Sequence, residues 1–193
     1  MSKVAILIDG GNSRVLAREA GKDYNPAYIA SIANSCLQSG ESLLRILYYD
    51  CAPYNGTAKL PVSGAEKTFS ASDGWLHELG RKDYFAIRLG VLKFRGFRPK
   101  HVPMSPQQFS DNDFKPIFEQ KGVDMRIGLD IAQFSENRAV DRIKLCTQDT
   151  DCIPAMKYAR RAGLQLVLIR FPNSHIAPEL LEYTDFDRPV GWP

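Results

Sequence analysis

The sequence predicts an α/β fold in which helices cover both faces of a mostly parallel central sheet. Four short, largely apolar runs occur along the chain, and such runs are typical of strands that are buried on both faces. Segments with helical spacing separate these runs, which is the alternation expected of βαβ units. The chain is also long enough, at 193 residues, to bury a sizeable core. The four runs are residues 4–8, 43–49, 143–146 and 164–169.

The first half of the chain carries clear signals for the boundaries of its elements. The first strand ends in Asp-Gly-Gly-Asn, a sequence typical of a turn. Asn25 supplies an N-cap and Pro26 a first-turn proline for a helix that ends before Gly40. Prolines and an Asn-Gly pair indicate a loop after the second strand. We expect a strand at residues 4–8, a helix at 27–37, a strand at 43–49, a loop at 51–64 and a helix at 66–79.

The second half repeats this alternation after an irregular middle segment. Four prolines fall within residues 95–118, which indicates irregular structure there. Val123, Ile127 and Ile131 recur at helical spacing, which predicts one buried helix face. We expect a strand or hairpin at residues 84–94, helices at 123–134, 154–162 and 178–183, and strands at 143–146 and 164–169.

Composition and residue patterning exclude several classes of protein. No apolar run is long enough to cross a bilayer and the N-terminus lacks the features of a secretory signal, so we expect no membrane partner. The four cysteines form no Cys-x-x-Cys pair and the three histidines no paired spacing, so neither a zinc site nor a disulfide framework is expected. We therefore expect a cytoplasmic protein. The oligomeric state stays open, with a homo-oligomer as one alternative.

Aspartates follow two of the predicted strands. Asp9 ends the first strand, and Asp149 follows the strand at residues 143–146, with Asp151 two residues later. The carboxyl ends of parallel strands meet at one edge of a sheet, so we expect these carboxylates to lie together. Their mutual repulsion favours a bound cation, and Mg²⁺ prefers such oxygen ligands. The alternative is that Asp9 and Asp151 are only helix caps or turn formers.

Two further aspartates lie on the predicted helix at residues 123–134. At about 100° per residue, Asp124 and Asp130 flank the buried Ile127 on opposite sides. Asp124 also lies in the first turn, where the helix dipole alone favours a carboxylate. We interpret Asp124 as a site residue. For Asp130, a site residue and a solvated boundary residue agree equally well with the pattern.

Three segments of the chain resemble the signature segments of the NYN domain, and more narrowly of its bacterial LabA-like branch within the PIN-like nuclease superfamily. They read ILIDGGN at residues 6–12, KGVDMRIGLDIA at 121–132 and TQDTDCIPA at 147–155. The resemblance keeps the same order as far as Leu168, which is nearly the whole chain. It implies a single domain over residues 1–193 with a PIN-like three-layer α/β/α sandwich.

The resemblance also implies a metal-dependent (endo)ribonuclease that uses Mg²⁺ or Mn²⁺, and the endo- or exonuclease mode stays open. Such chemistry needs carboxylates to hold the ion, which activates water and neutralises charge on the phosphate. The implied catalytic residues are Asp9, Asn12, Asp124, Asp149 and Asp151. The implied metal ligands are Asp9, Asp124, Asp130, Asp149 and Asp151.

Other residues near these segments are candidates for contact with RNA. Lys121, three residues before Asp124, can contact phosphate, or it is an ordinary solvated lysine. Asn12 can orient water or a carboxylate, or it serves only as a turn residue. Arg14 and the hydroxyl of Thr147 are further candidates for substrate binding.

A basic stripe lies in the middle of the chain. The net charge of the whole chain is +3, whereas residues 81–100 alone carry +6. The cations alternate with Phe94 and Phe97, and cations interleaved with aromatic rings suit single-stranded nucleic acid. The alternative is a solvated strand edge with both phenylalanines in the core. The candidate RNA-binding cations of the stripe are Lys93, Arg95, Arg98 and Lys100.

One position departs from the pattern of the family. Gln148 stands where the family usually has glycine, and its side chain narrows the approach of a substrate backbone. Two functions therefore stay open. One is a metal-dependent ribonuclease that cuts single-stranded or structured RNA, and the other is an RNA-binding or adaptor module whose PIN-like site is weak or inactive.

Overall fold

The structure is a computed structural model that describes residues 1–102 and 109–193. Its strands are β1 (Ser2–Asp9), β2 (Glu41–Cys51), β3 (Gly56–Lys59), β4 (Glu66–Phe69), β5 (Phe85–Pro99), β6 (Phe114–Lys121), β7 (Arg142–Cys146), β8 (Gln165–Arg170) and β9 (Phe186–Pro189). Its helices are α1 (Gly10–Glu19), α2 (Pro26–Ser35), α3 (Gly74–Gly80), α4 (Val123–Asn137), α5 (Ile153–Arg161) and α6 (Pro178–Glu182), with short 3₁₀ turns at Asp111–Asp113 and Thr150–Cys152.

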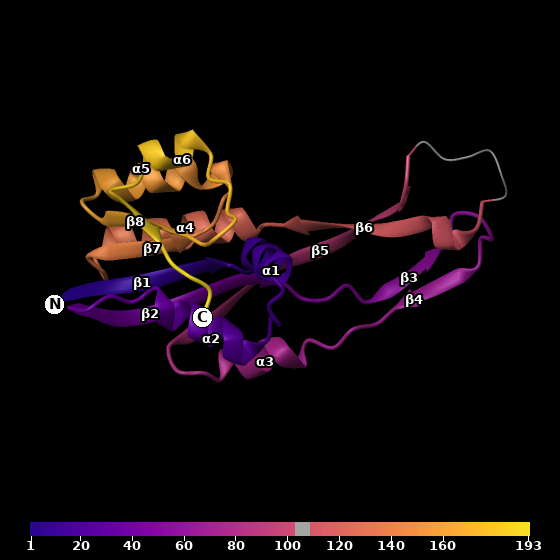
Figure 1. The fold of residues 1–193 in the computed structure, drawn as a ribbon, viewed down its shortest axis with the longest axis horizontal. Coiled ribbons are helices and arrows are strands. Elements are labelled where there is room, and N and C mark those ends of the chain that lie inside the picture. Colours follow the sequence, from indigo (N-terminus) through magenta and orange to yellow (C-terminus); the bar gives the residue numbers. More distant parts are fainter. Residues whose placement is uncertain (103–108) are drawn as a thin grey trace.

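A seven-stranded sheet runs through the molecule in the order β6-β5-β2-β1-β7-β8-β9, and β3 and β4 form a separate hairpin. All neighbouring strands of the large sheet are parallel except β5 and β6, which are antiparallel. Side chains of β1 alternate between the two faces. Ala5 and Leu7 pack towards α4, α5 and α6, whereas Ile6 and Ile8 pack towards α2 and α3 (Figure 1). The predicted α/β/α sandwich is therefore confirmed.

The order of the strands fixes where a ligand site can form. From β1 the chain first builds outwards through β2 and β5, and later returns to the other side of β1 with β7, β8 and β9. This reversal between β1 and β7 is a topological switch point, and open α/β sheets bind ligands beyond the carboxyl ends of the strands there. Asp9 ends β1, and residues 147–151 follow β7.

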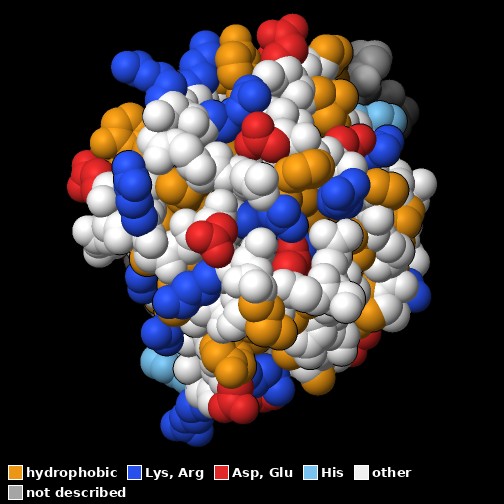
Figure 2. Space-filling view, turned by 90° about the vertical axis from the view of Figure 1, so that its left-hand side faces the viewer, with side chains coloured by type: hydrophobic (Ala, Val, Ile, Leu, Met, Phe, Trp, Pro, Cys, Tyr) orange, Lys and Arg blue, Asp and Glu red, His pale blue; other side chains and the backbone are white. Residues whose placement is uncertain are grey.

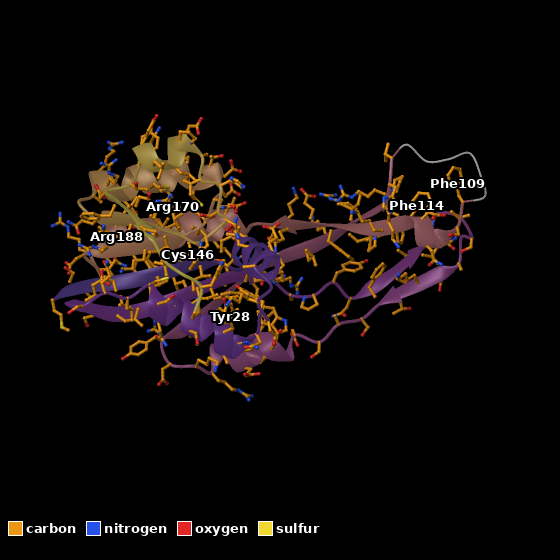
Figure 3. All side chains as sticks on the ribbon, in the orientation of Figure 1. Tyr28, Phe109, Phe114, Cys146, Arg170 and Arg188 are labelled. Carbon is orange, nitrogen blue, oxygen red and sulfur yellow. The ribbon has the colours of Figure 1, made fainter. Side chains whose placement is uncertain are left out.

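Two regions of the molecule differ in shape. The body contains β1, β2, β7, β8, β9, residues 85–90 of β5 and the helices. From Val91 onwards β5 leaves β2 and pairs only with β6, and this ribbon together with the β3–β4 hairpin forms the β arm. The arm projects away from the body (Figure 1), and Phe109 and Phe114 lie at its far end (Figure 3).

An aromatic cluster joins the two hairpins of the β arm. Phe69 of β4 lies against Phe94 of β5 and Phe118 of β6, with ring centroids 5.5 and 5.6 Å away. Tyr54 and Phe97 complete the cluster. Because these rings pack on one another rather than on the body, the arm has a small apolar core of its own.

Three expectations for the first half of the chain were wrong, the simplest being the loop expected at residues 51–64, which contains strand β3. The Asp-Gly-Gly-Asn segment does not form a turn: α1 begins at Gly10, with Asp9 as its N-cap. The expected helix at residues 66–79 is instead strand β4 followed by the short helix α3. Glu66, Lys67 and Thr68 are exposed, so the packing of Phe69 in the aromatic cluster decides the local structure.

The expectation that residues 95–118 are irregular was also wrong for those of them that the structure describes. The segment contains the end of β5 and most of β6. Pro116 stands opposite Phe97 in the outermost strand β6, and an edge strand tolerates a residue that cannot donate a hydrogen bond. Residues 103–108 lie outside the described residues. Strand β9 was not expected at all, because Asp187 and Arg188 interrupt its apolar pattern.

No helix among the described ranges, 1–102 and 109–193, has the length and apolar character needed to span a membrane.

Candidate metal centre

Asp9 is held rigidly at the end of β1. Its Oδ1 accepts the Asn12 backbone N–H at 3.1 Å, and the Thr147 hydroxyl donates to its Oδ2 at 3.2 Å. The residue is 7 % exposed. Burial raises the pKa of Asp9 above its ordinary value, the two hydrogen bonds oppose that shift, and the negative charges of Asp124 and Asp149 add to it. Asp9 is thus both a helix cap, as the alternative interpretation proposed, and a neighbour of the other acids.

The two glycines after Asp9 allow close packing at this point. A Cβ on Gly10 would lie 2.4 Å from the hydroxyl oxygen of Tyr48, and a Cβ on Gly11 would lie 2.8 Å from Oε1 of Gln120. Neither position therefore has room for a larger side chain without movement of its neighbours. The glycine pair that suggested a turn serves instead to bring α1 close to β2 and β6.

Three carboxylates converge beside Asp9. Asp124 lies in the first turn of α4, Asp149 precedes the 3₁₀ turn after β7, and Asp151 lies within that turn. One oxygen of each lies within 4.8 Å of an oxygen of the other two. Burial raises the pKa of Asp124, and the neighbouring charges of Asp149 and Asp151 raise it further, against the Asp124 backbone N–H, which lowers it. We term Asp124, Asp149 and Asp151 the acidic triad.

The acidic triad fits a hard divalent cation. All three donors are oxygens, and Mg²⁺ and Mn²⁺ prefer carboxylate and water ligands over nitrogen or sulfur. Thr147 holds Asp9 and Asp149 in position. Its hydroxyl oxygen accepts the Asp149 N–H at 3.1 Å, and its O–H donates to Asp9. Asp149 Oδ1 in turn accepts the Asp151 N–H at 2.8 Å. Thr147, predicted to bind substrate, is buried and instead positions the two acids.

A groove of about 810 Å³ opens in front of these acids. Asp9, Asn12, Asp124 and Asp149 line it together with Gln148. Asn12 donates through Nδ2 to Oε1 of Gln148 at 3.1 Å. Nε2 of Gln148 is buried and has no hydrogen-bond partner among the described residues. Gln148 therefore occupies one wall of the groove, as expected for a side chain that replaces glycine.

Asp130 does not join the acidic triad. Its Oδ2 accepts the Tyr49 hydroxyl at 2.9 Å and Nε of Arg88 at 3.0 Å. Asp124 and Asp130 are six residues apart on one helix, so they point about 120° away from each other. We therefore assign Asp130 to the ion pair with Arg88, which corrects its prediction as a metal ligand.

Arg14 and Lys121, two predicted phosphate contacts, both have acidic partners. Arg14 lines the groove but forms an ion pair with Asp50, which is 1 % exposed. Its guanidinium also lies 5.6 Å from the ring centroid of Trp75. Lys121 forms an exposed ion pair with Glu119 on the same strand. Arg14 thus has a position suited to substrate, whereas the charge of Lys121 is partly compensated.

The basic stripe separates into two faces when it folds. Its cations Lys93, Arg95, Arg98 and Lys100 are exposed along β5 and just beyond it. Phe94 and Phe97 are half-buried on the other face, in the aromatic cluster. The predicted interleaving of cations with free aromatic rings is therefore wrong, because the phenylalanines are packed as the alternative interpretation proposed. Arg95 forms an ion pair with Glu119, so its charge is partly compensated like that of Lys121, whereas Lys93, Arg98 and Lys100 remain available to a polyanion.

Two residues next to the groove were missed. Asp50 directly follows the strand predicted at residues 43–49, just as Asp9 follows the one predicted at 4–8, so its position was an available signal; in the structure it is the penultimate residue of β2. Gln120 lies on β6, and its side chain lines the groove between Gly11 and Asp50. The sequence offered no signal for Gln120, because β6 itself was not predicted.

Comparisons with known proteins agree with this architecture. The model of the NYN domain family matches residues 3–187, which include both the body and the β arm. No curated protein matches the chain significantly. A solved structure of a protein of unknown function from Vibrio parahaemolyticus is similar, with a TM-score of 0.57 and 16 % identity over 98 % of this chain and 93 % of that one. At that identity the likeness concerns the fold alone.

Proposed function

The chain belongs to the NYN domain family, and from this premise we propose that it is a metal-dependent ribonuclease that hydrolyses RNA phosphodiester bonds at the acidic triad. One observation carries the proposal. Asp124, Asp149 and Asp151 bring oxygens within 4.8 Å of one another at the switch point of the sheet. The resemblance of the three signature segments favours the LabA-like branch and an endonucleolytic mode. We also propose a single domain over residues 1–193.

The residues of the groove divide the work as follows. The acidic triad would hold the ion. Mg²⁺ or Mn²⁺, when bound, supplies a water of lowered pKa and positive charge that stabilises the phosphate. Asp9, predicted as a catalytic residue and a metal ligand, lies beside the triad with its carboxylate fixed by Asn12 and Thr147, and would complete the ligand set on that side. Asn12 lines the same groove, where its side-chain amide would orient a water or a carboxylate.

The β arm supplies the electrostatic attraction for RNA in this proposal. Lys93, Arg95, Arg98 and Lys100 are exposed along one strand, and cations in a row follow the phosphates of a nucleic-acid strand. Residues 91–100, where β5 enters the arm, hold these four cations and no acidic residue, whereas the chain as a whole carries only +3. The arm therefore attracts single-stranded or structured RNA while the body provides the acids.

The second candidate function is an RNA-binding or adaptor module without turnover. One contact favours it: Gln148 fills one wall of the groove and accepts a hydrogen bond from Asn12. This arrangement narrows access to the acids. The module would bind RNA in a salt-dependent way and would not cleave it at any metal concentration.

We propose a cytoplasmic location. Cys36, Cys51, Cys146 and Cys152 are all free thiols in the interior, which suits a reducing compartment.

An RNA cleavage assay with Mg²⁺ or Mn²⁺ tests the proposal. Asp149→Asn and Asp124→Asn should each lose at least about 100-fold in activity, because removing a group that stabilises transition-state charge has effects of that order. Asp83→Asn is the matched control, since Asp83 is an exposed aspartate that does not line the groove. Equal activity of wild type and Asp149→Asn would falsify the assignment.

Gln148→Gly separates the two candidate functions. If the glutamine only restricts access, the glycine variant should cleave faster than wild type and a chelator should stop both. RNA binding without cleavage by either protein, at every metal concentration, would favour the adaptor module instead.

A further inference from the structure

A second cavity lies next to the acidic groove, where the β arm joins the body. Its volume is about 470 Å³, within the range of small-molecule sites in proteins. The cavity and the acidic groove share two lining residues, Arg14 and Gln120. A ligand that occupied both would therefore place one part at the acids and another part in this second cavity.

The walls of this cavity are mainly aromatic. Tyr54, Phe69 and Phe118 line it from the arm, and Trp75 lines it from α3. The arm rings hold one another in place, with Tyr54 5.6 Å from Phe118 and 5.9 Å from Phe69 between centroids. Trp75 is fixed edge-on against Tyr48 at 6.1 Å. Such preformed aromatic walls favour a flat, apolar-faced ligand, because stacking then costs little ordering entropy.

The polar end of the cavity presents hydrogen-bond donors. Asp50 is almost fully buried, and its carboxylate accepts from Arg14, from the Tyr48 hydroxyl at 3.1 Å and from the Cys51 N–H at 2.7 Å. Asp50 is therefore occupied in fixing Arg14. A guanidinium has five N–H donors and no acceptor. Arg14 is partly exposed, so its remaining donors face the two cavities and select a ligand with acceptor atoms.

We infer that this cavity, termed the base pocket, binds an unpaired guanine or uracil of the RNA whose phosphate lies at the acidic triad. The inference rests on the proposed function. Guanine O6 and uracil O4 can accept hydrogen bonds from Arg14 where adenine and cytosine instead carry an amino group, a donor that cannot pair with a guanidinium, and the flat rings suit Tyr54 and Trp75. Gln120, whose Nε2 lies 3.4 Å from Oδ1 of Asp50, separates the base pocket from the acids and contacts the strand between them.

Fluorescence of Trp75 tests the base pocket without any need for cleavage. The chain has two tryptophans, and Trp192 stacks on Phe171 at 4.4 Å outside the pocket, so Trp192→Phe leaves Trp75 as the sole reporter. The protein is titrated with the four ribonucleoside 5′-monophosphates in the presence of a chelator. We expect GMP and UMP to quench Trp75 and to bind about tenfold more tightly than AMP and CMP.

A pair of alanine-to-phenylalanine variants, one that fills the base pocket and one outside it, provides the matched comparison. Ala71 and Ala65 are both exposed alanines near the β3–β4 hairpin, but only Ala71 lines the base pocket. Ala71→Phe should weaken quenching by GMP and UMP about tenfold, whereas Ala65→Phe should leave it unchanged. Ser70→Phe, at a second exposed lining position, repeats the test if Ala71→Phe unfolds, which thermal unfolding reports.

The outcomes separate this inference from the proposed function. Quenching by GMP and UMP without any RNA cleavage would support the base pocket and contradict the nuclease. Cleavage that depends on Asp149, with no quenching or with quenching unchanged in Ala71→Phe, would overturn the base pocket and leave the nuclease intact. Equal binding of all four nucleotides would overturn the assignment to guanine and uracil.

Discussion

The body and the β arm share the long strand β5, but they are stabilised in different ways. In the body, residues 4–8 of β1 are 0 % exposed, and helices cover both faces of the sheet. In the arm, the aromatic cluster is only half-buried, and Phe118 is 37 % exposed. The buried sheet therefore holds the segments that carry the acids in place, although Asp151 itself is exposed, whereas the arm presents charge and partly exposed aromatic surface.

The two regions also treat charge differently. The body buries charges in pairs: Lys144, which is 0 % exposed, contacts Glu41 at 2.6 Å. The arm leaves Lys93, Arg98 and Lys100 exposed on one face. At the end of the body opposite the arm, basic, acidic and hydrophobic side chains are interspersed over the face shown in Figure 2. Substitutions in the body should therefore change stability, and substitutions of arm cations should change binding.

The largest effect is expected from Glu41→Gln in the body. This change leaves the buried Lys144 without its counter-ion, and breaking a buried ion pair in this way costs about 3–5 kcal/mol. Chemical denaturation at pH 7 measures the loss. Glu19→Gln, at an exposed glutamate, is the control and should change the free energy of unfolding by less than about 0.5 kcal/mol.

The same pair predicts the pH dependence of stability. Burial opposes ionisation of Glu41, but hydrogen bonds from Lys144 and from the Gln38 N–H outweigh it and hold the pKa of Glu41 below its ordinary value. A lowered folded-state pKa adds stability above the pKa of the unfolded chain, and that stability is lost as pH falls through the folded value. The difference between wild type and Glu41→Gln should narrow in acid. A constant difference from pH 7 to pH 3 would contradict the role of this pair.

A smaller effect is expected when a divalent metal is added to the body. At 100 times its dissociation constant, a ligand that binds only the folded state raises the free energy of unfolding by about 2.7 kcal/mol. Mn²⁺ should therefore raise the melting temperature of wild type and of Asp83→Asn. Asp149→Asn should gain little, because it has lost one ligand of the acidic triad. Equal gains in all three proteins would show that the ion binds elsewhere.

Phe94→Ala tests the independence of the arm. Phe94 contacts Tyr54, Phe69, Phe97 and Phe118, but the cluster is half-exposed. We expect a loss of about 1–2 kcal/mol, less than the 3–5 kcal/mol typical of a buried phenylalanine. Hydrogen exchange should accelerate in β3–β6 and stay slow in β1 and β7. Equal acceleration in both regions would mean that arm and body unfold together.

The smallest effect on stability is expected from Arg98→Gln and Lys100→Gln. Both residues are exposed, so each change should alter the free energy of unfolding by less than about 0.5 kcal/mol. Each should instead make the plot of log RNA affinity against log salt concentration less steep, by about 0.7 in slope. Lys22→Gln, at an exposed lysine of the body, is the control. If it changes the slope as much as the arm variants do, the arm does not hold the RNA.

The sequence predicted the body well because its strands are buried on both faces. Residues 4–8 are apolar without alternation, and this pattern has few explanations other than a central strand. The N-cap of α2 was equally clear: Asn25 accepts the Tyr28 N–H at 2.9 Å. In these elements the local sequence signals and the burial of the residues agree, so the sequence pattern alone is enough to locate them.

The strand expected at residues 84–94 is the first part of β5, but the rest of the arm was not predicted because contacts between distant segments determine its structure. Phe69, Phe94 and Phe118 stabilise one another across three strands, and none of them lies in a long apolar run. Gly96, which has φ +96°, interrupts the pairing of β5 with β6, so the strand pattern is also broken in sequence. Prolines that normally end a strand are tolerated because β6 is an edge strand.

The candidate site was predicted in part. Asp9 and Asp149 were found because strand ends at a switch point are informative, and Asp124 because it flanks a buried helix face. Helical geometry alone could not show that Asp130 turns towards Arg88. The base pocket could not be predicted at all, since its walls come from the arm and from α3.

The joint between β6 and α4 connects the arm directly to the candidate site. Strand β6 ends at Lys121, Gly122 turns the chain with a φ of +76°, and α4 carries Asp124 one residue after its start. The carbonyl of Gly122 accepts a hydrogen bond from Arg126 at 2.8 Å, which braces this corner. Only Gly122 separates the arm from the helix that carries Asp124. A change in the direction of β6 relative to the body would therefore also move the Asp124 carboxylate relative to Asp149 and Asp151.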